Sequence, residues 1–280
     1  MRQFILPPSW DASRDGVLVL TGKDARRLAV VLRAQPGDTF PGLAPSGTRC
    51  QCEVLAARAE RVELRVRPEA GRQSATDMPP PDIRSGKTGA EEPLAGHESV
   101  PLPRIVLAAG ILKGSKLDDV VRAATEAGAA AFVPLATERS VPRGEFQGRL
   151  ARLRRVRDEA LGQSGSSVGT DISDALPLAD FLAAYPAGGT RLGVVFHETP
   201  LAKGSLHGYC TGDVEEIVAC VGPEGGFSAG ELDLLAAGGY GPAWLGPSVL
   251  RAQTAAVFAL ASIRILCLER ASWRLTKSGE

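Results

Sequence analysis

Residues 218–231 read VACVGPEGGFSAGE, and this stretch decides the fold of the second half of the chain. Its apolar start predicts a buried strand that ends at Gly222, where glycines and a proline make a tight loop. Ser228 and Glu231 then match the S-x-x-E capping box, which opens a helix. The stretch therefore predicts a strand that delivers a loop rich in exposed main chain directly onto a helix N-terminus.

A second loop of the same kind follows at residues 245–256, which read LGPSVLRAQTAA. Apolar and small residues then continue to Leu268, which predicts one long helix, buried in its own core or against a second subunit. Glycines suit a ligand that is bound by main-chain groups, because they remove side chains that would keep it away. One such turn alone is more often an ordinary strand-to-helix turn, but two close together favour a binding site.

From Arg104 onward, short apolar runs alternate with helical patterns. Strands are expected at residues 105–110, 131–135, 192–197 and 216–221, and helices at 117–127 and 149–161. This order implies a parallel sheet with helices on both faces. Ligands of such sheets bind outside the carboxyl ends of strands, where residues 197–199 and 222–227 are expected to meet. The missing P-loop and G-x-G-x-x-G patterns disfavour nucleotide hydrolysis and the ordinary dinucleotide fold.

The two loops together resemble the paired signature of the SPOUT-superfamily enzymes that methylate N3 of a uridine in small-subunit ribosomal RNA. The resemblance rests on residues 222–228 with Glu231, and on residues 245–255 with Leu245-Gly246, Val249-Leu250-Arg251 and Thr254-Ala255. Most of residues 104–268 is covered, with further matches in the expected order at Lys113-Gly114-x-Lys116, Glu126-x-Gly128, Glu138-Arg139-Ser140 and Gln163-Ser164.

The resemblance implies an α/β SPOUT fold: a small N-terminal PUA-like β-barrel, then a parallel-sheet domain with a C-terminal trefoil knot. It also implies a homodimer, S-adenosylmethionine as cofactor and small-subunit (16S) ribosomal RNA as partner. Together with the two glycine loops, it gives as cofactor-binding residues His197, Val221, Gly222, Gly225, Gly226, Leu245, Gly246, Val249, Leu250 and Thr254.

Methyl transfer is an in-line displacement, so the enzyme mainly has to align donor and acceptor. Arg251 is the candidate catalytic cation, because a fixed positive charge beside a uracil oxygen would stabilise the N3 anion. Glu224 is the nearest plausible proton acceptor. An equally good role for Glu224 is structural, since a carboxylate near a helix N-terminus helps to hold the loop.

Three positions depart from the pattern of this family. Ser248 and Ser166 stand where arginines are expected, and Gln253 stands where a glutamate is expected. Serine cannot hold a phosphate or a base as arginine does, so the departures weaken the RNA assignment more than the cofactor assignment. Three alternatives stay open: methylation of another RNA position such as a ribose hydroxyl, RNA binding without methylation, and a small-molecule α/β enzyme.

Residues 1–70 form a separate region with brief β-prone runs at 17–20, 50–55 and 61–66 and one helix at 24–33. These elements predict a small β-barrel that holds RNA. Arg26, Arg27 and Arg33 are expected to meet phosphates, with a solvated basic face as the alternative. Residues 71–103 are rich in proline and glycine and predict a flexible linker or insertion before the methyltransferase domain at 104–280.

A run of arginines falls on the helix expected at 149–161. Arg154 and Arg157 lie close together at helical spacing and are expected to bind RNA phosphates. The alternative is a solvated face paired with Asp158 and Glu159. The full run consists of Arg143, Arg149, Arg152, Arg154, Arg155 and Arg157.

Composition limits the class of protein. With 32 basic and 32 acidic side chains the formal net charge is zero, so RNA contact must come from a local patch. The five cysteines lack C-x-x-C spacing, which predicts no metal site, and Cys50 and Cys52 are expected to pack on one face of a strand. No segment reaches the ~18 uncharged apolar residues of a membrane span, and a cytoplasmic protein is expected.

Overall fold

The computed structural model describes residues 3–10, 16–69, 102–140, 146–166, 168–199, 205–210 and 213–277, without the side chains of 147 and 270–277. The predicted linker lies outside these residues except for 102 and 103, as does Arg143. The chain divides into two compact units, the first within 1–74 and 155–169 and the second within 75–154 and 170–280.

The first unit contains a five-stranded sheet in the order β1-β3-β4-β5-β2. The pair β1–β3 is parallel and the other pairs are antiparallel. All three predicted strands are present, as β2, β4 and β5. The bounds are β1 (Phe4–Ile5), β2 (Gly16–Thr21), β3 (Thr39–Leu43), β4 (Arg49–Arg58) and β5 (Arg61–Pro68).

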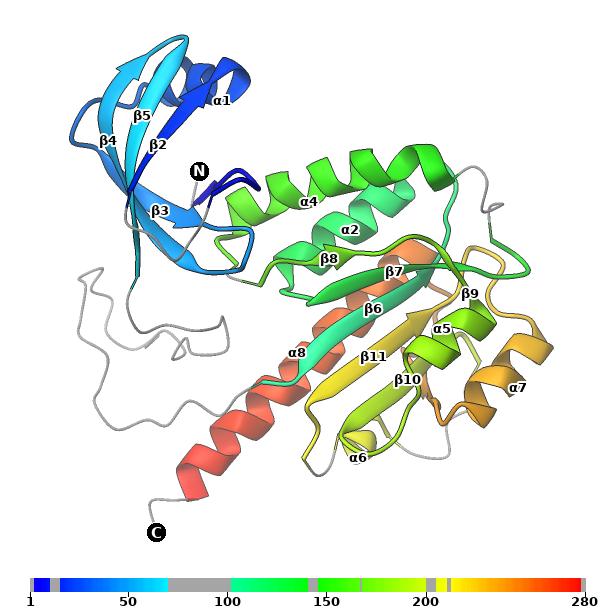
Figure 1. Cartoon of the computed structure of the whole chain (residues 1–280). Coiled ribbons are helices and arrows are strands. Elements are labelled where there is room, and N and C mark those ends of the chain that lie inside the picture. Colours follow the sequence, from blue (N-terminus) through cyan, green and yellow to red (C-terminus); the bar gives the residue numbers. More distant parts are fainter. Residues whose placement is uncertain are drawn as a thin grey trace. The chain divides into compact units, whose positions relative to one another are not determined.

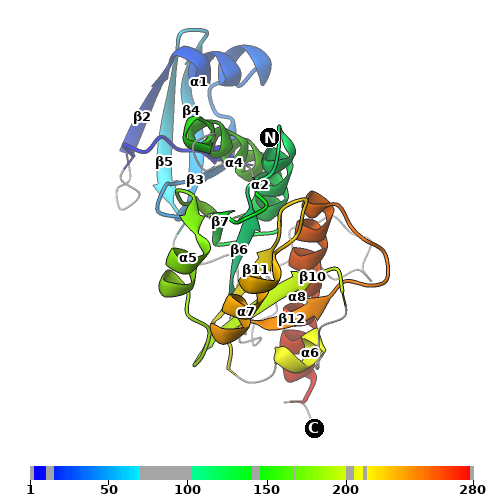
Figure 2. The ribbon, with the colours of Figure 1, turned by 90° about the vertical axis from the view of Figure 1, so that its right-hand side faces the viewer.

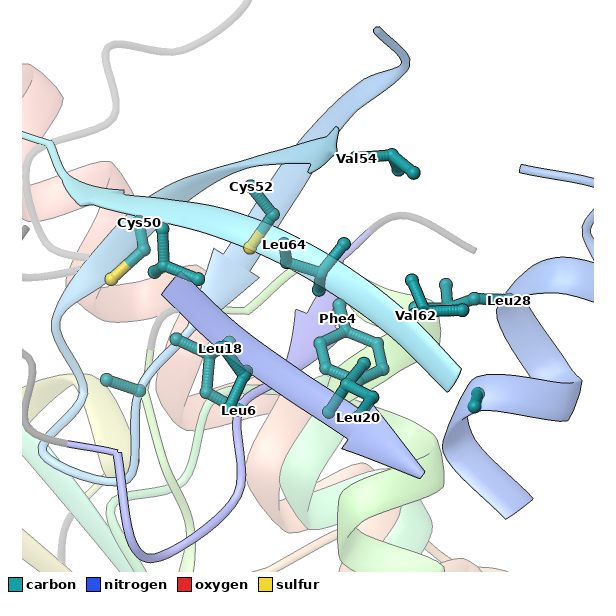
Figure 3. Packing of buried hydrophobic residues seen from close by; sticks show 13 residues of the cluster. Phe4, Leu6, Leu18, Leu20, Leu28, Cys50, Cys52, Val54, Val62 and Leu64 are labelled. Atoms are coloured by element: carbon teal, nitrogen blue, oxygen red, sulfur yellow. The ribbon is translucent and has the colours of Figure 1, made fainter. Parts of the chain in front are cut away.

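Alternating residues of β4 and β5 form the core of this unit (Figure 3). Cys50 and Cys52 point into it as free, fully buried thiols, as the sequence predicts. Burial raises the pKa of Cys52 to about 12, so the group is an inert thiol. The core consists of Phe4, Leu6, Leu18, Leu20, Ala25, Leu28, Ala44, Cys50, Cys52, Val54, Val62, Leu64 and Val66.

The helix expected at 24–33 begins and ends two residues earlier and changes its winding. α1 (Gly22–Arg26) continues into η1 (Arg27–Val31), a π-helical turn closed by a hydrogen bond of 3.0 Å from the Leu32 N–H to the Arg27 carbonyl. Arg33 then adopts a φ of 53°, which is uncommon for a side chain other than glycine. Ala25 and Leu28 are buried, so this segment covers the core of the sheet.

The second unit is built on a parallel sheet in the order β12-β10-β11-β6-β7-β8, with β9 also paired to β7 (Figure 1). Every pairing in it is parallel, which confirms the predicted α/β class. The strands are β6 (Arg104–Gly110), β7 (Ala131–Ala136), β8 (Asp171–Ile172), β9 (Leu176–Pro177), β10 (Arg191–His197), β11 (Glu216–Val221) and β12 (Gly241–Trp244).

Helices cover both faces of this sheet (Figure 2). α8 packs against α2, β6 and β11, whereas α5 and α7 pack on the other face through Phe181, Leu235 and Tyr240. α4 begins in this unit, and its part from Arg155 groups with the first unit. The helices are α2 (Lys116–Glu126), α4 (Leu150–Ser164), α5 (Leu178–Ala184), α6 (Leu206–Tyr209), α7 (Ala229–Ala237) and α8 (Ala252–Lys277).

The segment Ala252–Glu269 of α8 is long and apolar enough to cross a membrane by length and composition, with a mean hydropathy of 1.4. It includes Arg264, whose guanidinium donates to the Ala127 carbonyl at 2.7 Å. Ala256, Ala259, Leu260 and Ile263 are buried in the unit. In all, a third of this segment is buried inside the unit.

Candidate functional site

A cavity of about 340 Å³ lies at the carboxyl ends of β10 and β11, where the sequence predicts the two loops to meet. Such a volume is in the range of small-molecule sites. Most of its lining residues belong to 221–227 and 245–255. The cavity is lined by Lys116, Phe196, His197, Glu198, Val221, Gly222, Pro223, Glu224, Gly226, Phe227, Leu245, Gly246, Ser248, Val249, Leu250, Arg251, Ala252, Gln253 and Ala255.

The first loop folds back tightly on itself. The Gly226 N–H donates to the Pro223 carbonyl at 2.9 Å, and Gly226 has a φ of 67°, which favours glycine. A Cβ on Gly222 would lie 3.0 Å from the main chain of Gly226 and Phe227. The loop therefore presents backbone groups to the cavity because its glycines allow a turn that larger residues would open.

The predicted capping box follows the loop. The Ser228 side chain accepts from the Glu231 N–H at 3.3 Å, and Glu231 Oε2 accepts from the Ser228 N–H at 2.8 Å. Phe227 and Ser228 are buried, and Phe227 belongs to the core between the sheet and α7. The end of the loop is thus fixed by both hydrogen bonds and packing.

Pro223 fixes the start of the loop against the neighbouring strand. Gly110, the last residue of β6, lies beneath it, and a Cβ on Gly110 would come within 2.5 Å of the Pro223 ring and nitrogen. Real Cβ atoms essentially never approach so closely, so the contact requires glycine at this position.

Glu224 is held by the start of α2 and the segment before it. Its Oε1 accepts from Lys116 Nζ at 2.8 Å and from the Lys113 N–H at 3.3 Å. Partial burial raises the pKa of this carboxyl, but the hydrogen bonds and the charge of Lys116 outweigh burial, so that the pKa lies below its ordinary value. An ionised, paired carboxylate is a weak proton acceptor, which favours the structural role that the sequence left open.

The second loop joins β12 to α8. Gly246 has a φ of 112°, which again requires glycine, and the Ala255 N–H donates to the Arg251 carbonyl at 2.8 Å to close the first turn of α8. The Arg251 side chain is exposed at the cavity wall. The site therefore places a cation at the junction of loop and helix, as the sequence predicts.

The chain after β10 completes the cavity. His197 Nδ1 accepts from the Thr199 N–H at 3.1 Å, so the proton of a neutral imidazole resides on Nε2. The Trp244 indole N–H donates to the Glu198 carbonyl at 3.1 Å and ties this segment to β12. His197 and Glu198 thus meet the first loop at one cavity, as the sequence predicts for this end of the sheet, whereas Thr199 does not line it.

Most of the predicted cofactor residues line this cavity, together with Arg251 and Glu224. Gly225 and Thr254 are not among the lining residues. Gly225 instead packs beneath Arg139, whose Nη1 donates to its carbonyl at 2.8 Å. Those that line it are His197, Val221, Gly222, Gly226, Leu245, Gly246, Val249 and Leu250.

Two of the three departures from the family pattern line the cavity. Ser248 and Gln253 both line the cavity, and among the described residues Gln253 Oε1 is a buried oxygen without a hydrogen-bond partner. Ser166 is not a lining residue. It belongs to the first unit, where its carbonyl accepts from Gln3 Nε2 at 2.7 Å.

The predicted site residues leave out several lining residues, among them Lys116 and Phe196. The sequence does indicate Lys116, because this residue belongs to the Lys113-Gly114-x-Lys116 match to the family. Its pairing with Glu224 joins residues 108 positions apart, so no local pattern could predict it.

The arginines expected to bind RNA are not among the lining residues. Arg26, Arg27, Arg33 and Arg154 are exposed, and Arg157 pairs with Asp158 at 2.7 Å. Two other members of the run have internal partners. Arg149 donates to the Leu112 and Gly114 carbonyls, and Arg152 pairs with the buried Asp118.

The described parts of the chain hold no group of three or more His, Cys, Asp or Glu residues that could bind a metal ion. All five cysteines are buried free thiols.

Comparison with known proteins assigns the family. Residues 98–264, more than half of the chain, match the model of the RNA methyltransferase domain. The chain belongs to this family. Among the relatives is the ribosomal RNA small subunit methyltransferase E of Synechocystis, 34% identical over 66% of this chain and 60% of that protein. The Bacillus subtilis protein of the same name is 23% identical over 87% of this chain and 88% of its own.

The fold of this family member also matches solved structures. A ribosomal RNA small subunit methyltransferase E from Neisseria gonorrhoeae, bound to S-adenosyl methionine, superposes with a TM-score of 0.73 over 95% of this chain and 98% of that chain, at 21% identity. A methyltransferase from Legionella pneumophila with the same cofactor gives 0.71 over 94% and 97%, at 22% identity. At these identities the likeness establishes the fold alone.

Proposed function

We propose that the protein is an S-adenosylmethionine-dependent methyltransferase that acts on N3 of a uridine in small-subunit ribosomal RNA. The observation that carries this proposal is the single cavity walled by both glycine loops in a member of the RNA methyltransferase domain family. The relatives named as small-subunit methyltransferases support the choice of RNA.

The residues around the cavity fit a nucleoside-containing cofactor. Main-chain groups of the two loops can form hydrogen bonds with a base and a ribose. Phe196, Leu245 and Leu250 supply apolar surface in the same cavity. His197, Val221, Gly222, Gly226, Gly246 and Val249 complete the proposed binding set. Gly225 and Thr254 are proposed to shape the loops from outside the cavity. When bound, S-adenosylmethionine would supply the sulfonium methyl group for transfer to the RNA.

Arg251 is the proposed catalytic residue. Loss of the N3 proton spreads negative charge onto the uracil oxygens, and a guanidinium beside one of them stabilises that anion. Its position at the start of α8 fixes the main chain from which it extends. Truncation to alanine should therefore reduce turnover far more than cofactor affinity.

Glu224 is proposed to hold the cavity wall rather than to remove the proton. Its pairing with Lys116 keeps the carboxylate ionised and orients the loop at residues 222–227. The proton of N3 would then pass to solvent water.

The first unit is proposed to be a PUA-like β-barrel that holds the RNA through Arg26, Arg27 and Arg33. Further phosphate contacts are proposed for Arg154 and Arg157. The second unit is proposed to contain the trefoil knot of the SPOUT fold.

A cytoplasmic homodimer is also proposed. Apolar side chains exposed along α8 support the dimer: Val257, Phe258, Ile265 and Leu268.

The proposed function is tested by two measurements on the full chain. Calorimetric titration with S-adenosylmethionine should show saturable binding, and labelled methyl groups should pass to unmodified small-subunit ribosomal RNA. Arg251→Ala should retain cofactor binding within a few-fold and lose most of the transfer, by about 100-fold or more for one stabilising group. Equal losses of binding and turnover would argue against a catalytic role for Arg251.

A second candidate function is RNA binding without methylation. It is favoured by the neutral side chains of Ser248 and Gln253 at the cavity, where the family pattern expects charges. RNA affinity without cofactor affinity in the same titrations would support it. Label on a ribose hydroxyl would instead indicate methylation of another RNA position.

A further inference from the structure

Glu231 has a hydrogen-bond partner outside the helix that it caps. Its side chain is buried, with the residue 9% exposed. Oε2 accepts from the Ser228 N–H at 2.8 Å within the capping box, and Oε1 accepts from the Glu138 N–H at 2.7 Å. Glu138 is 93 positions away, in the turn that follows β7. One carboxylate therefore joins two loops.

The turn that follows β7 is itself well ordered by hydrogen bonds. The Thr137 N–H donates to Ser140 Oγ at 3.0 Å, and the Ser140 N–H donates to the Thr137 carbonyl at 3.2 Å. Because these bonds close the turn on itself, it can act as a fixed support for a neighbouring segment.

This turn touches the cavity loop at a second point. Arg139 Nη1 donates to the Gly225 carbonyl at 2.8 Å. The side chain also packs on Gly225, where an added Cβ would lie 3.1 Å from Arg139 Cβ. The first loop is thus held in its middle by Arg139 and at its end by Glu231.

The sheet order makes these contacts informative. β6 lies between β7 and β11, so the turn at residues 137–140 crosses the carboxyl end of β6 to reach the loop that follows β11. At that same end, Pro223 rests on Gly110. The loops after three adjacent strands are therefore locked together beside the cavity, although Glu231, Glu138 and Arg139 do not line it.

We propose that Glu231 is a positioning residue of the cavity, which sets the loop at residues 222–227 by binding the N–H groups of Ser228 and Glu138 together. A carboxylate accepts at both oxygens, whereas an amide accepts at one and donates at the other. Glu231→Gln therefore leaves one buried N–H facing an NH2 group. The effect of Glu231 on methyl transfer rests on the proposed function, whereas its effect on the position of the loop does not.

The test compares Glu231→Gln with Asp233→Asn, which makes the same change of charge at an exposed position of α7. Hydrogen exchange is measured for the amides of residues 222–228 and 137–140 in the ligand-free protein, and the dissociation constant for S-adenosylmethionine is measured well below the unfolding temperature. Glu231→Gln should speed exchange at these amides and raise the dissociation constant, each about tenfold, the effect of one unsatisfied buried donor. Asp233→Asn should change neither.

Arg139→Ala provides an independent variant in case Glu231→Gln folds poorly, because Arg139 is exposed and holds the same loop. It should speed exchange at residues 222–228 without lowering protection of the sheet. The inference is overturned if Glu231→Gln folds and leaves exchange in both segments unchanged, or if all amides of the unit lose protection equally. Should the native protein fail to bind the cofactor, the proposed function fails while the exchange data still decide the role of Glu231.

Discussion

Lys116 Nζ lies 2.8 Å from Oε1 of Glu224, and this pair connects the start of α2 to the loop after β11 at the edge of the cavity. The Lys113 N–H donates to the same oxygen at 3.3 Å. Two segments that line or adjoin the candidate site are therefore held by one ionised carboxylate.

Glu224→Gln should lower stability in a pH-dependent way. The pKa of Glu224 is lowered in the folded protein. The pair of Glu224 and Lys116 therefore stabilises the folded state at pH values above 4.5, the ordinary pKa of the group, and this contribution is lost as the pH falls through the folded pKa. Because both side chains are about one-third exposed, the effect should be under about 1 kcal/mol. The difference in unfolding temperature between native protein and variant should be largest near neutral pH and should shrink as the pH falls below 4.5. Asp119→Asn, which breaks a surface pair with Arg122, is the control, and a difference that grows in acid would contradict the assignment.

Gly110→Ala should distort the cavity from outside. The added methyl would come within 2.5 Å of Pro223, which must shift, at a cost of about 1–3 kcal/mol for overpacking. Thermal unfolding should show the loss of stability, and calorimetry should show weaker cofactor binding. Gly148→Ala is the matched control, since a Cβ there meets nothing within 4 Å. Equal behaviour of the two variants would rule out the Pro223 contact as a determinant of the site.

Local sequence patterns predict the parts of this site that depend on neighbours in the chain. The capping box of Ser228 and Glu231 is confirmed with both of its hydrogen bonds. The expected strand ending at Val221 is present as β11, and the predicted long helix is present as α8. These features follow from propensity and spacing, which a single sequence contains.

The remaining features depend on contacts between distant residues or on weak local signals. β12 contains Gly241 and Pro242, which hide its strand character, yet it pairs along β10. The second partner of Glu231 and the pairing of Glu224 with Lys116 join residues 93 and 108 positions apart. A local pattern gives no register between such segments, so only the folded sheet identifies these partners.

Replacing Arg26, Arg27 and Arg33 by alanine should weaken RNA binding, because their guanidinium groups would no longer neutralise phosphates. For each phosphate left without its arginine, the slope of log affinity against log salt should fall by about one. The triple variant should thus bind RNA more weakly with a flatter salt dependence, while cofactor affinity is unchanged. Filter binding over a salt series measures both, with Arg58→Ala as a control at another exposed arginine of the first unit. An unchanged slope would leave these arginines as a solvated basic face.

Phe258→Asp should disrupt the proposed homodimer. Val257, Phe258, Ala261, Ile265 and Leu268 are exposed and share one side of α8, at about 100° per residue. A charge placed in an apolar interface has to be desolvated, so association should weaken by about 10-fold or more. Analytical ultracentrifugation should show a native dimer, a largely monomeric Phe258→Asp variant, and a dimeric Leu234→Asp control altered at an exposed leucine of α7. A native protein that sediments as a monomer would contradict the dimer.

Nucleoside analysis of the reaction product tests the central claim most directly. Unmodified small-subunit ribosomal RNA is incubated with the full chain and labelled S-adenosylmethionine, digested to nucleosides and separated by liquid chromatography with mass spectrometry. The proposed function predicts label in 3-methyluridine, greatly reduced with Arg251→Ala. RNA without labelled 3-methyluridine, from protein shown to bind both cofactor and RNA, would contradict it.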